Sequence, residues 1–133
     1  MGKTAPQKKQ ISNLSFIFSE QQNGSRAVSM SAVAFDGTRV VLSEERWRHV
    51  IFRHPELKGK VDSVLDAIAH PDETYADEGG AVHVLKRLVG EVSDFLVVIY
   101  VVEGQRGYIR TAYYTSNARK MRRYRQFRKL KRS

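Results

Sequence analysis

Two segments of the chain carry side chains that could move protons and hold a phosphate. A predicted helix carries His49 and ends in Arg53-His54-Pro55, and residues 107–115 read Gly-Tyr-Ile-Arg-Thr-Ala-Tyr-Tyr-Thr. Imidazoles exchange protons near neutral pH, and hydroxyl groups can hold a phosphate in place. The two segments therefore predict proton transfer at a phosphate ester, without a metal ion.

The spacing of these residues indicates which of them could share a site. On a helix, His49 and Arg53 are four residues apart and lie on one face, whereas Trp47 turns towards the core. In a strand, every second side chain points to the same face, and a neighbouring strand could bring Arg87 into the same cleft. The strand face expected to line this cleft comprises Ile109, Thr111, Tyr113 and Thr115.

Each feature also has a simpler interpretation. A single histidine at a helix end is commonly a capping or surface side chain, and Thr and Tyr are common in strands because they suit a pleated surface. The occurrence of His49 and His54 within six residues, beside Arg53, makes the catalytic interpretation as favourable as the simple one.

The positive charge of the chain is concentrated at one end. The protein has 23 Lys and Arg against 14 Asp and Glu, a net charge of +9, and residues 119–132 contain nine of these cations and no acid. A basic tract beside aromatic residues is typical of contact with nucleic acid. The alternative is a solvated tail that binds an acidic partner protein. The cations expected to bind RNA are Arg119, Arg122, Arg123 and Arg125.

Composition restricts the class of protein. A chain of 133 residues fits one domain, and the lack of cysteine excludes disulfides and thiolate metal sites. No apolar run approaches the roughly 18 to 20 residues of a membrane span, so a soluble cytoplasmic protein is expected, without membrane contact. No P-loop, His-Glu-x-x-His or glycine fingerprint is present, and the four histidines are too scattered for a zinc pattern. We expect no metal or other cofactor.

The order of the predicted elements indicates an α+β fold. Ser43 is a good N-cap and Pro55 disfavours helical geometry at His54, so a helix is expected between them. Residues 58–69 predict a second helix, with an apolar face of Val61, Val64, Leu65 and Ile68. The predicted strands are 14–18, 27–35 and 39–42, which form a β meander, and 81–88, 94–102 and 107–115, which form an antiparallel sheet.

The remaining segments are expected to lie outside the core. The acidic pairs Asp72-Glu73 and Asp77-Glu78 are next to glycines and predict a solvated loop. Met121, Tyr124 and Phe127 step by three and drift around a helix, so the basic end is expected to be a helix or tail without an apolar stripe. The chain thus divides into a disordered N-terminus (1–10), a single domain (11–118) and a basic tail (119–133).

Several motifs in residues 43–115 resemble a known family. They are Trp-Arg-His-Val-Ile-Phe-Arg-His-Pro-Glu at 47–56, Pro71-Asp72, Val-Leu-Lys-Arg at 84–87 and Tyr-Ile-Arg-Thr-Ala-Tyr at 108–113. Together they are similar to the phage-associated branch of the superfamily of ribonucleases that includes barnase, EndoU, colicin and RelE (the BECR fold). The sequence departs from related toxins at Tyr114, where these often have proline.

The resemblance implies a helical segment packed on an antiparallel sheet and toxin-like, metal-independent cleavage of RNA. By this analogy His54, or else His49, removes the proton of a 2′-hydroxyl group, which attacks the adjacent phosphorus to give a cyclic phosphate. Arg87, with Arg53, would stabilise the phosphoryl charge. Thr111 and Tyr113 would position the phosphate, with Thr115 beside them as a substrate-binding residue. A toxin of this kind also implies a neutralising antitoxin or immunity protein.

Two other functions are compatible with the same residues. One is a catalytically inactive module that binds RNA or DNA through the basic tail alone. The other is a RelE-like mRNA interferase that cuts only on the ribosome, where the ribosome completes a weak site.

Overall fold

The computed structural model describes residues 14–20 and 26–130. The predicted disorder of residues 1–10 and the expected turn at 21–25 lie outside the described residues, as do Lys131 and Arg132.

Eight strands in the described ranges form one mixed sheet, in the order β1-β2-β3-β7-β6-β5-β4-β8. Neighbouring strands are antiparallel except β3 and β7, which are parallel. The predicted α+β class is confirmed. The strands of the predicted meander and those of the predicted antiparallel sheet belong to one sheet, which is mixed. The strands are β1 (Leu14–Glu20), β2 (Arg26–Val33), β3 (Arg39–Ser43), β4 (Glu73–Ala76), β5 (Val82–Arg87), β6 (Phe95–Glu103), β7 (Arg106–Thr115) and β8 (Arg128–Lys129).

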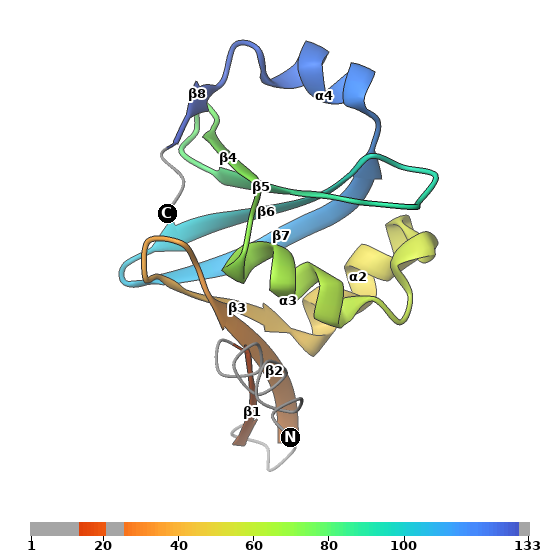
Figure 1. The fold of residues 1–133 in the computed structure, drawn as a ribbon. Coiled ribbons are helices and arrows are strands. Elements are labelled where there is room, and N and C mark those ends of the chain that lie inside the picture. Colours follow the sequence, from red (N-terminus) through yellow and green to blue (C-terminus); the bar gives the residue numbers. More distant parts are fainter. Residues whose placement is uncertain (1–13, 21–25, 131–133) are drawn as a thin grey trace, which may run out of the picture.

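Helices cover both faces of this sheet (Figure 1). Helices α2 (Glu44–Arg53) and α3 (Val61–Ala69) lie on one face, and α4 (Asn117–Tyr124) lies on the other. Strand β6 is central and buried on both faces, as predicted. Leu96, Val98 and Tyr100 join the cluster beneath α2 and α3, and Phe95 and Val97 join the cluster beneath α4.

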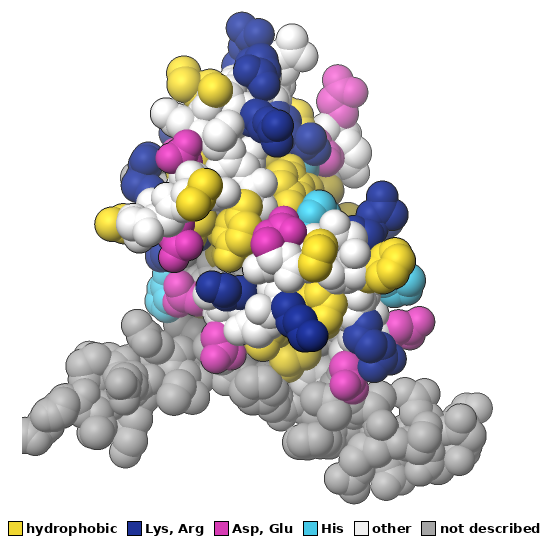
Figure 2. All heavy atoms as spheres, turned by 90° about the vertical axis from the view of Figure 1, so that its right-hand side faces the viewer, with side chains coloured by type: hydrophobic (Ala, Val, Ile, Leu, Met, Phe, Trp, Pro, Cys, Tyr) yellow, Lys and Arg dark blue, Asp and Glu magenta, His cyan; other side chains and the backbone are white. Residues whose placement is uncertain are grey.

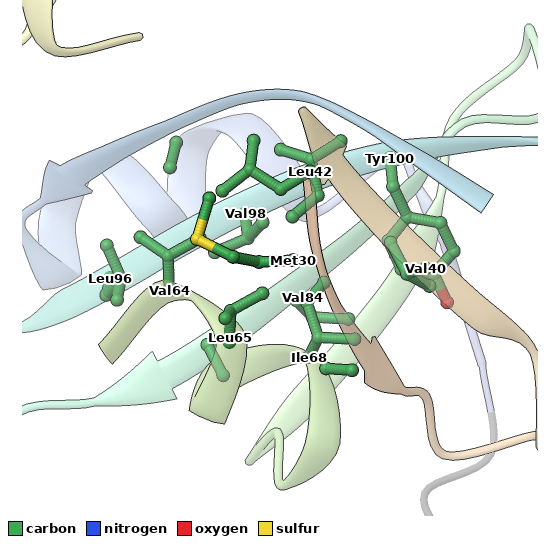
Figure 3. Close-up of a cluster of buried hydrophobic side chains, with 14 of the residues drawn as sticks. Met30, Val40, Leu42, Val64, Leu65, Ile68, Val84, Leu96, Val98 and Tyr100 are labelled. Atoms are coloured by element: carbon green, nitrogen blue, oxygen red, sulfur yellow. The ribbon is translucent and has the colours of Figure 1, made fainter. Parts of the chain in front are cut away.

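The main core lies between α3 and the sheet (Figure 3). The predicted apolar face of α3 is confirmed, since Val64, Leu65 and Ile68 are fully buried and Val61 packs against them. The helix begins at Val61 and not at 58, because Gly59 has a φ of +79°, which a helix does not allow.

Helix α2 has the predicted ends. The Ser43 hydroxyl accepts a hydrogen bond from the Arg46 backbone N–H at 3.1 Å, and the helix ends at Arg53. His54, before Pro55, leaves helical geometry (φ −132°, ψ 73°), and a 3₁₀ turn, η1 (Pro55–Leu57), follows. The buried Leu57 anchors this turn to the core. The chain direction at His54 is therefore determined by proline geometry and by one buried side chain.

The basic C-terminal segment is part of the core, which corrects the prediction that it has no apolar stripe to contribute to the core. Tyr124 is only 3% exposed, and Phe127 packs against the same cluster. Strand β8 pairs with β4, and the Leu130 N–H donates to the Thr74 carbonyl at 2.9 Å. Helix α4 ends at Tyr124, so Phe127 reaches the cluster from the following turn and no helical stripe is needed.

The prediction of a solvated acidic loop at 72–78 is also wrong. Glu73 to Ala76 form β4, between β5 and β8. Only the turn at the glycines is as expected, with Gly80 at φ +92°. Glu73 pairs with Lys120 of α4, and Asp77 lies within hydrogen-bond distance of His83, which contacts Tyr124 of α4. These contacts connect the sheet to α4.

Candidate active site beneath helix α4

A β-bulge in β7 decides which of its side chains face α4. Ile99 pairs with Thr111 and Tyr100 pairs with Ile109, so Arg110 is an extra residue without a partner in β6. The predicted alternation therefore fails at this point, because Ile109 faces the main core while Thr111 faces the opposite side. The predicted face is correct only for Thr111, Tyr113 and Thr115.

The end of β7 and α4 enclose a cleft of about 420 Å³. Its position is determined locally, because the Ser116 hydroxyl caps α4 by accepting the Arg119 backbone N–H at 3.2 Å. Figure 2 shows Lys and Arg side chains at the top of the molecule, the end at which α4 lies in Figure 1. The cleft is lined by Tyr113, Tyr114, Thr115, Arg119, Lys120, Arg122, Arg123 and Tyr124.

The cations of this cleft differ in their partners. Lys120 donates to Glu73 at 2.8 Å, and Arg123 lies over the Tyr124 ring at 5.8 Å. Arg119 and Arg122 are exposed and make no ion pair with another residue in the described ranges. Two guanidinium groups are therefore free to bind an anion in the cleft. Predicted Arg125 follows α4 and is exposed, but it does not line the cleft.

Tyr113 places a buried hydroxyl beside these cations. The hydroxyl has no hydrogen-bond partner among the described residues. Burial is the main cause that raises the pKa of Tyr124, and the nearby Tyr113 hydroxyl raises it further. The two hydroxyl groups do not form a hydrogen bond of good geometry. An unpaired buried hydroxyl costs about 1 to 3 kcal/mol, so a small movement of the ring that brings the hydroxyl to a hydrogen-bond partner would be favourable.

His54 does not line the cleft, but its ring lies beside that of Tyr113, which does. The two rings are 5.9 Å apart between centroids, and the His54 side chain is 30% exposed. The Glu56 carboxylate oxygen is 3.8 Å from His54 Nδ1, because the 3₁₀ turn brings it back towards the imidazole. At this distance Glu56 makes no hydrogen bond to the ring, but it places a negative charge beside the Nδ1 side of the imidazole. The position of Glu56 was not predicted from the sequence, although Glu56 directly follows Pro55.

Arg87 lies beside the cleft and does not line it. Arg87 pairs with Phe95, and Phe95 with Thr115, so all three share one face of the sheet. The guanidinium lies 4.9 Å from the Phe95 ring centroid and 3.9 Å from the Glu73 carboxylate. Its charge is therefore partly engaged by Glu73.

The structure separates the two predicted histidines. His49 and Arg53 share one face of α2 as predicted, but they line a different groove, together with Glu45, Arg48 and Phe52. Thr111 is half-buried and lies on the face of Tyr113, but outside the cleft. Of the predicted catalytic set, only His54 and Tyr113 lie in contact.

A buried network that no local spacing indicated holds α4 on the sheet. His83 is 1% exposed, its Nε2 lies 3.0 Å from an Asp77 carboxylate oxygen, and its Nδ1 lies 2.8 Å from the Tyr124 hydroxyl. Because a carboxylate only accepts, Nε2 donates to Asp77 and Nδ1 accepts from Tyr124. The partners are 6 and 41 residues from His83 in sequence. Both ring nitrogens are satisfied, which favours a structural role.

This network predicts a stability that depends on pH. Burial lowers the pKa of His83 below the ordinary 6.5, although Asp77 acts to raise it. Below about pH 6.5 the unfolded chain takes up a proton that the folded protein does not, so the free energy of unfolding should fall as the pH decreases. The slope for one proton is at most about 1.4 kcal/mol per pH unit.

Urea unfolding between pH 7.5 and 5 measures this slope. The variant His83→Asn, which keeps an acceptor for Tyr124, should be less stable at pH 7.5 but show a smaller slope. Equal slopes for the two proteins would contradict the assignment.

Comparison with known proteins identifies no family: no family model, no curated protein and no solved structure matches the chain. In the described ranges, no three His, Asp or Glu side chains form a group that could hold a metal ion. Within the same ranges, no helix is both long and apolar enough to cross a membrane.

Proposed function

We propose that the protein is a metal-independent endoribonuclease whose active site is the cleft beneath α4. One observation carries the proposal: Arg119 and Arg122, which make no ion pair within the described part of the chain, line the same cleft as Tyr113, and the His54 imidazole lies 5.9 Å from the Tyr113 ring between centroids. The cleft offers positive charge and hydrogen-bond donors to a phosphate, with a base beside it. The motif resemblance in residues 43–115 supports the same reaction class.

In the proposed reaction, His54 accepts the proton of a ribose 2′-hydroxyl group. The 2′-oxygen attacks phosphorus, the bond from phosphorus to the 5′-oxygen breaks, and that oxygen takes a proton from solvent. The products are a 2′,3′-cyclic phosphate and a 5′-hydroxyl end, and the imidazolium returns its proton to water. The Glu56 carboxylate, on the Nδ1 side, stabilises the imidazolium that this step forms.

The arginines stabilise the charge that grows on the phosphoryl oxygens. Arg119 and Arg122 are the principal candidates, because guanidinium groups bind phosphate through two parallel hydrogen bonds. The role predicted for Arg87 is secondary, because its contact with Glu73 reduces the charge it can offer. Thr115, at the end of β7, offers a hydroxyl in the same cleft.

Binding of RNA should depend on salt through these cations. The double variant Arg119→Gln/Arg122→Gln should lower the slope of log K against log salt concentration by about 1.4, at roughly 0.7 per phosphate contact with a single strand. Fluorescence anisotropy with a labelled single-stranded oligonucleotide measures the slope.

A matched control removes the same charge elsewhere. Arg106 and Arg110 are exposed at the start and at the bulge of β7, away from the cleft. The variant Arg106→Gln/Arg110→Gln should keep the wild-type slope. Equal slopes for both double variants would show that charge in general, and not the cleft, attracts the RNA.

The biological setting is a further part of the proposal. A ribonuclease of this kind acts on RNA in the cytoplasm. The chain has no cysteine and therefore no disulfide that the reducing cytoplasm could break. A free ribonuclease would damage its own cell, so a toxin-like role with a neutralising antitoxin or immunity protein follows.

The test of the function is incubation of the purified protein with labelled RNA, without ribosomes, with and without EDTA. Cleavage in both conditions is expected. Binding without cleavage would favour an inactive nucleic-acid-binding module. Cleavage that requires added ribosomes would favour a RelE-like interferase.

A further inference from the structure

Helix α2 presents an aromatic ring that the proposed reaction does not use. Phe52 is 85% exposed, although Trp47 and Ile51 on the same helix pack against the core. Arg48 and His49 lie one turn before Phe52 on the helix surface. Together with Glu45 and Arg53, these residues line a groove of about 570 Å³.

We propose that Phe52 stacks an unpaired base of the RNA whose phosphate binds beneath α4, an inference that rests on the proposed ribonuclease function. The base covers the exposed ring, and Arg48 and Arg53 face the phosphates on either side of it. An aromatic ring that stacks on a base, with cations for the backbone, is the usual arrangement for binding single strands.

The surroundings of Phe52 favour a base over a protein partner. Protein-docking sites are contiguous apolar patches of several hundred Å². Phe52 is the only exposed large hydrophobic residue of α2, and its neighbours in the groove are polar or charged. A single ring among cations fits one base and its phosphates.

The position of Phe52 connects this groove to the cleft. Phe52 precedes His54 by two residues, and the His54 ring lies 5.9 Å from that of Tyr113, which lines the cleft. Helices α2 and α4 lie on opposite faces of the sheet, but β3 pairs with β7 only at residues 106–108. A nucleotide strand can therefore pass from the ring to the phosphate site around the free edge of β7 beside His54. A base in a duplex has no free face for Phe52, so the groove selects single-stranded RNA.

The experiment uses an oligonucleotide that cannot be cleaved, in which every sugar carries a 2′-O-methyl group and one base is 2-aminopurine. Stacking on Phe52 should quench the 2-aminopurine fluorescence on binding. The variant Phe52→Ala should lose this quenching and bind the single strand about 5- to 150-fold more weakly, the range for one base–aromatic stack. Phe52→Trp should restore both.

The matched control is Tyr108→Ala. Tyr108 is also an exposed aromatic residue, at 39%, but it lies near the start of β7, at the opposite end from the cleft. This variant should bind as the wild type does. Quenching and affinity that are unchanged in Phe52→Ala, or an equal loss in Tyr108→Ala, would overturn the proposal.

The two proposals can fail separately. If wild-type protein cleaves RNA but Phe52→Ala binds normally, the base site is wrong and the ribonuclease function stands. If wild-type protein does not cleave RNA but quenching depends on Phe52, the base site stands and the ribonuclease function is wrong.

Discussion

Replacing Tyr124 with alanine should lower the free energy of unfolding by about 3 to 5 kcal/mol, the range for truncating a large buried aromatic side chain. Tyr124 is 3% exposed, stacks on the Tyr75 ring at 4.7 Å and donates to His83. Its removal opens a cavity between α4 and the sheet, so it should also disturb the cleft. Urea unfolding followed by circular dichroism measures the loss.

Two controls test whether the loss of stability comes from the buried Tyr124 ring or from any substitution in α4. Tyr124→Phe keeps the ring but leaves His83 Nδ1 without a donor, and should cost about 1 to 3 kcal/mol. Met121→Ala, at a position on the same helix that is 62% exposed, should change stability by less than about 0.5 kcal/mol. If Tyr124→Ala were as stable as Met121→Ala, α4 would not be part of the core.

His54→Ala should reduce RNA cleavage by about 100-fold or more, the effect of losing a general base. The side chain is 30% exposed and belongs to neither buried cluster, so the fold should persist. Because the proposed phosphate-binding cations remain, the affinity for RNA should change much less than the rate. Single-turnover cleavage with excess enzyme separates the two quantities.

The chain provides a matched control for this substitution. His70 ends α3 and precedes Pro71, with φ −136° and ψ 64°, nearly the backbone geometry of His54. His70 is exposed and does not line the cleft. His70→Ala should therefore retain the wild-type rate. A His54→Ala variant as active as His70→Ala would remove His54 from the mechanism, and His49 would be the next candidate.

Features set by neighbouring residues could be predicted from the sequence. The N-cap at Ser43 and the end of α2 before Pro55 are local effects of a hydroxyl and of proline sterics, and both are confirmed. The central position of β6 was equally predictable, since residues 95–100 are apolar in both alternations. His54 was singled out because it lies within six residues of His49 and beside Arg53.

Features that depend on distant contacts could not be predicted. The bulge at Arg110 arises where β7 leaves the regular register with β6, and it reverses the side of the sheet that Ile109 faces. Two acidic residues lie at the ends of β4. Glu73 pairs with Lys120 of α4, and Asp77, directly after β4, pairs with His83 of β5. No spacing within the sequence relates these residues. Tyr124 lies among basic residues in the sequence, so its place in the core could not be predicted from its neighbours.

In the proposed reaction, a ribose 2′-hydroxyl group is the nucleophile. The most direct measurement uses a DNA oligonucleotide that contains a single ribonucleotide, with fragment masses determined by mass spectrometry. We expect one cut, directly after the ribonucleotide and resistant to EDTA, that leaves a 2′,3′-cyclic phosphate. Cuts at deoxynucleotides, or a linear phosphate formed without the cyclic product, would contradict the claim.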